Sequence, residues 1–237
     1  MGRNNYFQFK QFRIEQKRSA MKVGIDGILL GAWADVHDCN TILDIGTGTG
    51  LIALMLAQRS KARITAIEIE KNAAEEASEN VAASPWEKRV DVQNVSLQNF
   101  AAGSNQQFDL IVSNPPFFQN SLKAGNENRS LARHTDSLPY KTLMEITSTL
   151  LTEEGRCAFI FPAMALKEIE NLAPLSQLYL KRITMVAPNE NKPVNRILVE
   201  MSKKENSTEA DSLQIYNNDG SWNDNFKRLT RDYYLNF

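Results

Sequence analysis

Short apolar runs alternate with amphipathic segments over most of the chain from residue 41 onward. Segments with apolar residues at helical spacing occupy 51–60, 71–82 and 138–151. The apolar, β-rich runs between them are predicted strands, at 41–45, 62–68, 90–94, 108–113 and 156–161. Strands joined by crossover helices run parallel and are buried on both faces, which explains why these runs are nearly continuous rather than alternating. The pattern predicts an α/β, doubly wound sheet.

Further elements are predicted at both ends of this core. The runs 178–187 and 194–201 flank a turn-rich hexapeptide and predict an antiparallel hairpin at the edge of a mostly parallel seven-stranded sheet. Residues 1–40 are predicted to form an N-terminal extension with a helix capped by Asp26. After the main domain, 41–204, we expect a polar linker and an aromatic tail that docks on the domain, over 205–237.

Composition limits the classes of function. The chain has 237 residues, 42% hydrophobic content and a formal net charge of −1, so a packed core is expected and the whole molecule exerts no general attraction on polyanions. Positive charge is nevertheless concentrated in residues 1–22, where six basic residues accompany the single acid Glu15. Such a segment is either a local nucleic-acid contact or simply a solvated surface.

Cysteine and histidine are too scarce for several kinds of chemistry. Cys39 and Cys157 have no metal-ligand spacing, and His37 and His134 are the only histidines, so we expect no disulfide framework, no metal site and no Ser-His-Asp machinery. No apolar stretch is long enough for a membrane span, and the N-terminus lacks the apolar region of a secretory signal. A cytoplasmic, monomeric protein is expected.

A glycine motif follows the first predicted strand of the core. It reads Asp44-Ile45-Gly46-Thr47-Gly48-Thr49-Gly50, at the edge where open α/β sheets bind ligands. Gly46, Gly48 and Gly50 allow close backbone approach to a ligand, and Asp44 offers a carboxylate to an ammonium or hydroxyl donor. The loop lacks the Gly-Lys-Ser/Thr ending of a phosphate-binding loop. The alternative is a turn that serves only helix–strand packing.

Acidic and hydroxyl side chains follow the next two strands. Glu68 ends the second strand, where an acid can bind both hydroxyls of a ribose. Glu70 is interpreted as a solvated acid that opens the next helix. Ser96 follows the third strand and is placed beside an adenine ring. An acid-rich pocket repels phosphates and favours an ammonium and a sulfonium, so the predicted cofactor is S-adenosylmethionine. Thr47, within the glycine motif, is a further predicted cofactor-binding residue.

The fourth predicted strand ends in Asn114-Pro115-Pro116-Phe117, at the same edge of the sheet. An aryl amine is a poor nucleophile, so an enzyme that methylates one must hold the nitrogen with acceptors. The Asn114 side chain and the Pro115 carbonyl are such acceptors, consecutive prolines stiffen the loop, and Phe117 offers a stacking face for a base. The alternative is a purely structural turn.

Together these motifs resemble those of class I amino methyltransferases with a Rossmann-like fold. More narrowly, the chain resembles the bacterial tRNA1(Val) (adenine(37)-N6)-methyltransferases in Phe9–Phe12, in Met21–Ala34 and in Leu229–Leu235. The resemblance implies S-adenosylmethionine-dependent methylation of the adenine beside the valine anticodon. It also implies that Met21–Gly31 closes over the cofactor pocket.

Two other enzymatic functions remain open, namely ribosomal RNA guanine-N2 methylation and protein glutamine N5 methylation, but the N-terminal segment favours tRNA adenine over both. A non-enzymatic RNA-binding role is disfavoured, because it predicts damage to Asn114 or to the glycines and both are intact. We expect tRNA to contact basic side chains in two segments. The first comprises Lys10, Arg13, Lys17, Arg18 and Lys22, and the second comprises Lys123, Arg129, Arg133 and His134.

Overall fold

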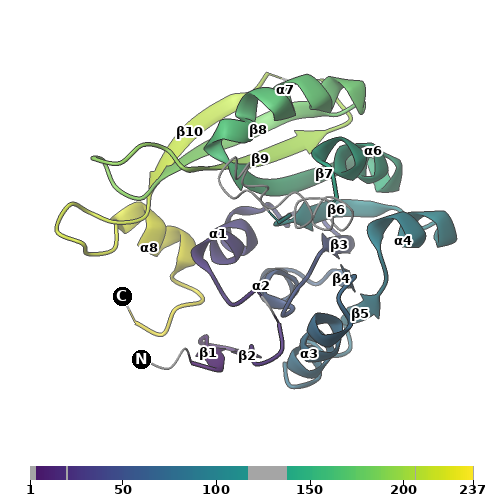
Figure 1. The fold of residues 1–237 in the computed structure, drawn as a ribbon, viewed down its shortest axis with the longest axis horizontal. Coiled ribbons are helices and arrows are strands. Elements are labelled where there is room, and N and C mark those ends of the chain that lie inside the picture. Colours follow the sequence, from purple (N-terminus) through teal and green to yellow (C-terminus); the bar gives the residue numbers. More distant parts are fainter. Residues whose placement is uncertain (1–3, 20, 117–137, 206, 237) are drawn as a thin grey trace, which may run out of the picture.

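The computed structural model describes residues 4–19, 21–116, 138–205 and 207–236 (Figure 1). A small hairpin, β1 (Tyr6–Gln8) and β2 (Arg13–Glu15), precedes the main sheet. The main sheet has the strand order β10-β8-β9-β7-β6-β3-β4-β5. Its strands are β3 (Thr41–Ile45), β4 (Arg63–Glu68), β5 (Val90–Asn94), β6 (Phe108–Ser113), β7 (Leu151–Pro162), β8 (Tyr179–Ala187), β9 (Arg196–Ser202) and β10 (Glu209–Gln214).

Helices cover both faces of this sheet, which gives three layers (Figure 1). One face packs against α1 (Ile25–Trp33) and α2 (Leu51–Arg59), with α3 (Lys71–Ala82) and α8 (Asp224–Thr230) beside them. The other face packs against α4 (Leu97–Gly103), α6 (Tyr140–Leu150) and α7 (Leu166–Leu175), the last following the 3-10 turn η1 (Ala163–Ala165). The two apolar cores are therefore separated by the sheet.

The predicted doubly wound α/β fold is confirmed, but the predicted strand count of seven is wrong. β10 is an eighth strand, parallel to β8, within the stretch predicted to be a polar linker. The sequence of β10 is mostly polar because the strand lies at the sheet edge: Glu209 to Ser212 are exposed, and Leu213 is buried. β8 and β9 pair antiparallel as predicted, but β10 covers β8, so this hairpin is not at the edge. The short helices α4 and α7 also went unpredicted.

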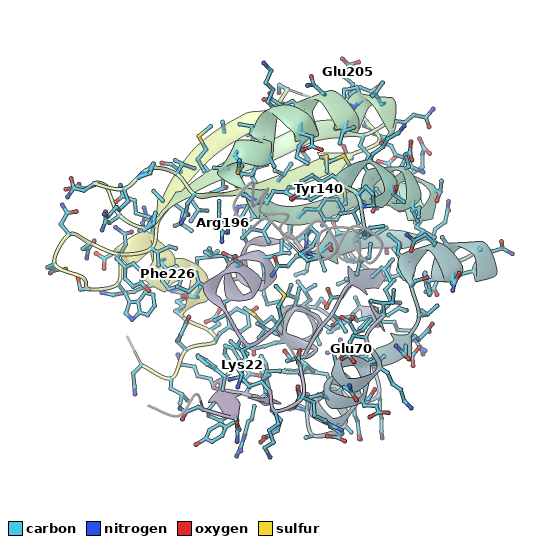
Figure 2. The ribbon with its side chains drawn as sticks, in the orientation of Figure 1. Lys22, Glu70, Tyr140, Arg196, Glu205 and Phe226 are labelled. Atoms are coloured by element: carbon cyan, nitrogen blue, oxygen red, sulfur yellow. The ribbon has the colours of Figure 1, made fainter. Side chains whose placement is uncertain are left out.

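The start of α1 differs from the prediction. Gly24, not Asp26, is the N-cap residue, and its backbone is extended. The Asp26 carboxylate lies in the first turn and forms an ion pair of 3.0 Å with Arg196 Nε, at the beginning of β9. Figure 2 shows Arg196 beside α1. Asp26 therefore lies inside the first turn rather than at the cap, and its ion pair with Arg196 attaches α1 to β9.

The two ends of the described chain pack together against α2. The Tyr233 side chain is 1% exposed and its hydroxyl donates to the Met55 carbonyl at 3.0 Å. The Lys10 amide donates to the Tyr233 carbonyl at 2.9 Å. Phe9 and Phe12 stack with ring centroids 4.6 Å apart, and both are buried. The aromatic residues at both ends therefore extend the core on the α2 side.

Candidate active site

The glycine loop between β3 and α2 adopts a conformation that requires glycine. Gly46, Gly48 and Gly50 have φ values of 69°, 58° and 82°, in the left-handed region that side chains disfavour. A Cβ atom added at Gly46 or Gly48 would have no heavy atom within 4 Å, so open space adjoins the backbone there. At Gly50 an added Cβ would lie 3.5 Å from the Ala77 Cβ, because α3 packs closely against the loop. The loop therefore leaves room for a ligand at its first two glycines.

Asp44 organises this loop from inside the protein. Its side chain is fully buried, and Oδ2 accepts hydrogen bonds from Thr47 Oγ1 at 2.6 Å and from the Ala53 amide at 3.2 Å. Burial raises the pKa of Asp44 from 3.8 to about 7, against the opposing effect of these two hydrogen bonds. Oδ1 is also shielded from solvent and has no hydrogen-bond partner among the described residues. A buried, unpartnered carboxylate oxygen fits a site that receives a cationic or hydroxyl donor.

Glu68 holds the opposite side of the loop. Its carboxylate accepts from the Gly48 amide and from the Glu70 amide, both at 2.9 Å, and the residue is 9% exposed. Each oxygen retains capacity for a further donor such as a ribose hydroxyl. The Asn94 side-chain amide donates to the Glu68 carbonyl at 2.8 Å, which fixes the turn after β4.

Glu70 caps α3, as the sequence predicted. Its carboxylate accepts from the Asn72 and Ala73 amides, and these hydrogen bonds lower the pKa of Glu70. Figure 2 places Glu70 at the start of this helix. The hydroxyl of Ser96, which was predicted to lie beside an adenine, accepts from the Asn99 amide at 3.2 Å as the cap of α4. Its position after β5 keeps it at the ligand edge of the sheet.

The end of β6 lies next to the end of β3. Ser113 is the register partner of Ile45, and the Ser113 hydroxyl donates to the Ile45 carbonyl at 2.9 Å. Asn114 and Gly46 follow these two residues directly, so the Asn-Pro-Pro segment and the glycine loop leave the sheet side by side. Asn114 Oδ1 is shielded from solvent and has no hydrogen-bond partner among the described residues. Pro115 is buried and Pro116 is exposed.

Strand alternation places the polar side chains of this edge on one face of the sheet. Leu43 and Ile67 belong to the core beneath α4 and α6, so their neighbours Asp44 and Glu68 face the side of α1 and α2. Asn114 is two positions beyond Val112, which also belongs to the α1 and α2 core. Asp44, Glu68 and Asn114 therefore lie at the carboxyl edge of the sheet, on the α1 side.

The basic N-terminal side chains have local partners. Arg13 and Lys17 form ion pairs with Glu15, at 2.6 and 3.3 Å, and Arg13 lies 3.7 Å above the Tyr6 ring. Arg18 pairs with Glu75 at 3.8 Å and also with Glu79. Lys10 Nζ donates to the Arg231 carbonyl at 2.6 Å, and Lys22 is half-buried. The predicted positive surface is thus partly neutralised by acids of β2 and α3.

The remaining predicted residues lie outside the described chain. These are Phe117, Lys123, Arg129, Arg133 and His134. In the part that is described, no group of three or more His, Cys, Asp or Glu residues could hold a metal ion. Over the same residues, no helix combines the length and the apolar character needed to cross a membrane.

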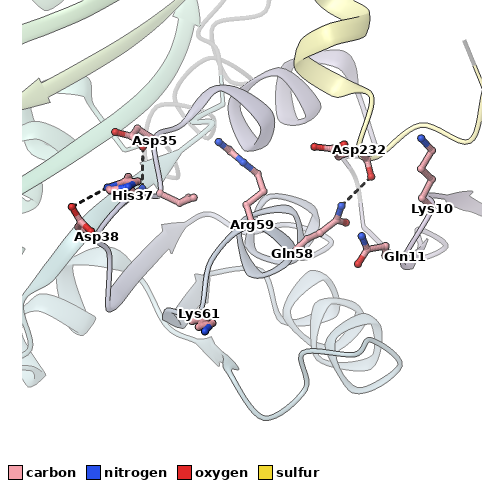
Figure 3. A pocket seen from close by; sticks show the side chains of 10 residues that line it. Lys10, Gln11, Asp35, His37, Asp38, Gln58, Arg59, Lys61 and Asp232 are labelled. Carbon is pink, nitrogen blue, oxygen red and sulfur yellow. Dashed lines mark hydrogen bonds and ion pairs between the residues drawn. The ribbon is translucent and has the colours of Figure 1, made fainter.

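A depression of about 980 Å³ lies at the opposite, amino edge of the sheet (Figure 3). It is formed by the end of α2, the segment after α1 and the chain termini. Charges of both signs line it, namely Lys10, Arg59 and Lys61 with Asp35, Asp38 and Asp232. Among the described residues, none of the predicted cofactor or catalytic side chains lines this depression, so it is not the candidate active site.

Sequence reasoning missed two buried polar residues on α3 that bind the N-terminal segment, one of which also donates to the glycine loop. Glu76 and Asn80 are 1% and 2% exposed, and both bind main-chain groups near β2. The available signal was their spacing of four residues on a helix face that otherwise carries Ala73 and Ala77. Polar residues on an alanine-lined buried face indicate specific hydrogen bonds.

Comparison with known proteins agrees with this architecture. Residues 27–136 match the Methyltransferase small domain family. A predicted O-methyltransferase from Agrobacterium tumefaciens superimposes with a TM-score of 0.66 at 20% sequence identity, covering 88% of this chain and 96% of that one. A ribosomal protein L11 methylase from Lactobacillus delbrueckii gives a TM-score of 0.57 at 19% identity, covering 80% and 84%. At these identities the likeness establishes the fold.

Much closer relatives cover the whole chain. The tRNA1(Val) (adenine(37)-N6)-methyltransferase of Trichodesmium erythraeum is 45% identical over 236 residues, which covers 98% of this chain and 99% of the relative. The protein of the same name from Haemophilus influenzae is 43% identical over 233 residues, covering 98% and 99%. Fold and site thus define a methyltransferase with a Rossmann-like sheet. Within this class, the chain belongs to the tRNA1(Val) (adenine(37)-N6)-methyltransferase family.

Proposed function

We propose that the protein transfers a methyl group from S-adenosylmethionine to the N6 amino group of an adenine in tRNA, at adenine 37 of tRNA1(Val), the substrate in the names of its relatives. The observation that carries the proposal is the position of Asn114. Its carboxamide oxygen is shielded from solvent and has no hydrogen-bond partner among the described residues, and the chain at Asn114 leaves the sheet beside the glycine loop. A buried acceptor without a partner costs free energy unless a ligand donor satisfies it.

The described residues at this edge fit the cofactor. Asp44 Oδ1 would accept from its ammonium group, and the Glu68 carboxylate would accept from its ribose hydroxyls. The space at Gly46 and Gly48 admits the ligand close to the backbone. When bound, the cofactor supplies a methyl group activated by a sulfonium centre.

The role of Asn114 follows from the chemistry of an exocyclic amine. The nitrogen lone pair of adenine N6 is delocalised into the ring, so the amine attacks poorly unless the nitrogen is held in a pyramidal geometry. Asn114 Oδ1 would accept one N–H of the amine and so orient the lone pair. Pro115 and Pro116 restrict the backbone that carries this acceptor, so its position is set before the substrate binds.

The proposal is tested by asking which polymer receives the methyl group. The protein is incubated with methyl-labelled S-adenosylmethionine and, separately, with tRNA, ribosomal RNA or a protein extract from cells that lack it. We expect label in the tRNA alone, and at least about a hundredfold less label with Asn114→Ala. Label in ribosomal RNA or in protein would instead support guanine or glutamine methylation.

A further inference from the structure

Asn80 connects the N-terminal segment to the glycine loop through its side chain. Nδ2 donates to the Thr49 carbonyl at 2.9 Å and to the Glu15 carbonyl at 2.9 Å, and Oδ1 accepts from the Glu15 amide at 2.8 Å. Thr49 lies between Gly48 and Gly50, within the loop at the candidate cofactor site. Asn80 is 2% exposed, so these hydrogen bonds are protected from competition with water.

The segment that Asn80 contacts is itself fixed to α3. Glu76, one turn earlier on the helix, accepts from the amides of Lys17 at 2.5 Å, Arg18 at 2.9 Å and Ser19 at 2.8 Å. Figure 1 shows β2 beside α3. Glu76 and Asn80 therefore dock residues 15–19 on α3, but only Asn80 also reaches the loop. This difference separates the two roles experimentally.

Two hydrogen bonds hold the peptide between Thr49 and Gly50: the Gly50 amide donates to the Thr47 carbonyl at 2.9 Å, and the Thr49 carbonyl accepts from Asn80. Other loop amides have partners in the sheet and in the loop itself. The Gly46 and Thr47 amides donate to the Ile67 carbonyl, and the Gly48 amide donates to Glu68. Gly50 has a left-handed backbone, and glycine changes conformation at little cost, so a second partner on the carbonyl side of this peptide restrains its orientation further. Asn80 supplies that partner from outside the loop.

We propose that Asn80 is a positioning residue that makes cofactor affinity depend on the docked N-terminal segment, although neither is assigned a contact with the cofactor. The side chain holds the loop in the conformation that leaves Gly46 and Gly48 open, and the main chain of Glu15 holds the side chain. This inference rests on the proposed function, because it assigns the glycine loop to S-adenosylmethionine.

The test is calorimetric binding of S-adenosylhomocysteine to the full chain, with thermal unfolding measured in parallel. Asn80→Ala removes all three hydrogen bonds, and Asn80→Asp keeps the acceptor for the Glu15 amide but loses both donors. We expect each to weaken binding about tenfold or more, the effect of losing about 1.4 kcal/mol. In turnover assays the KM for S-adenosylmethionine should rise more than kcat falls.

Two matched variants on α3 complete the design. Glu76→Gln weakens the attachment of residues 15–19 to α3 and leaves the hydrogen bond to Thr49 in place. Its affinity for S-adenosylhomocysteine should therefore lie between those of the parent and of Asn80→Ala. Ser78→Ala changes an exposed residue whose hydroxyl bonds within the helix, and should bind like the parent.

Parent-like affinity and KM in the folded Asn80 variants would overturn the proposal. Failure of both Asn80 variants to fold would also overturn it, because Asn80 would then be a residue of the fold rather than of the loop. A parent protein that does not bind S-adenosylhomocysteine would refute the proposed function itself.

Discussion

The Ser113 hydroxyl donates a hydrogen bond of 2.9 Å to the Ile45 carbonyl, and thereby joins the ends of the two central strands β6 and β3. Both residues are buried, and each is followed directly by a segment of the candidate active site. The order in which strands are added to the sheet reverses direction between β3 and β6. Doubly wound sheets bind ligands at the carboxyl ends of the strands at such a point. A methyl donor held by one strand end and an amine held by the other would meet at this point.

Replacing Asn114 by Ala should lower kcat by about a hundredfold or more while cofactor affinity stays near that of the parent. The reason is that Oδ1 is assigned to the substrate amine and not to the cofactor. Steady-state kinetics and S-adenosylhomocysteine calorimetry measure the two quantities separately. Asn99→Ala, at an exposed position, is the control. A parent-like rate for Asn114→Ala would mean that the Asn-Pro-Pro segment is a structural turn.

Replacing Glu68 by Ala should weaken cofactor binding by about 1–3 kcal/mol, the range for hydrogen bonds to a charged group. The neighbouring acid Glu70 offers a matched control, because its carboxylate is used in capping α3. Glu70→Gln should lower thermal stability slightly and leave affinity unchanged. If calorimetry showed equal losses for the two variants, the ribose would not be bound by Glu68 in particular.

The raised pKa of Asp44 predicts two opposite pH dependences. In the folded protein Asp44 keeps its proton up to about pH 7, whereas its ordinary pKa is 3.8. Its contribution to stability is therefore complete below the ordinary pKa and is lost as pH rises through about 7. A ligand ammonium favours the ionised form, so cofactor affinity should instead increase between about pH 6 and about pH 8.

Calorimetry in buffers of different ionisation enthalpy tests the second dependence directly. Binding of S-adenosylhomocysteine near neutral pH should release a fraction of a proton from the parent, and Asp44→Asn should release less. Identical proton release from the two proteins would exclude Asp44 as the group that meets the ammonium.

Changes at the basic N-terminal residues should weaken tRNA binding less than their charge implies. Each nucleic-acid phosphate that a basic side chain neutralises contributes about 0.9 to the magnitude of the slope of log affinity against log salt concentration. Arg13 and Arg18 already lie beside acidic residues, so a phosphate must compete with these partners. We expect the double variant Arg13→Ala with Arg18→Ala to reduce the magnitude of the slope by less than the loss of two such contacts would.

The comparison variant is Arg129→Ala with Arg133→Ala, in the second predicted segment. We expect it to reduce the salt slope more than the N-terminal pair does, with cofactor affinity unchanged in both. Parent-like slopes for both double variants would assign these charges to a solvated surface.

The sequence was most informative where residue type and strand position coincide. Asp44, Glu68 and Asn114 each stand at or directly after the end of an apolar run, and parallel strands bring such ends to one edge. The glycine pattern was equally informative, because positive φ values are required at Gly46, Gly48 and Gly50.

The sequence was least informative where tertiary contacts override local preference. Aspartate is a residue type preferred at N-caps, so Asp26 was predicted to be one. Its side chain instead forms an ion pair with Arg196, 170 residues away in the chain, and no local pattern reveals that pair. β10 carries polar side chains because it lies at an edge, so its apolar pattern is too weak to predict a strand. The hydrogen bonds of Asn80 join three segments distant in sequence, and only the folded arrangement brings them together.

The central claim is the identity of the methylated atom, and nucleoside mass spectrometry tests it most directly. An unmodified tRNA1(Val) transcript is incubated with the protein and S-adenosylmethionine, digested to nucleosides and analysed beside the product of Asn114→Ala. We predict N6-methyladenosine from the parent, little from the variant, and none from a transcript in which adenine 37 is replaced by guanine. N2-methylguanosine, or N6-methyladenosine that persists in the replaced transcript, would contradict the account.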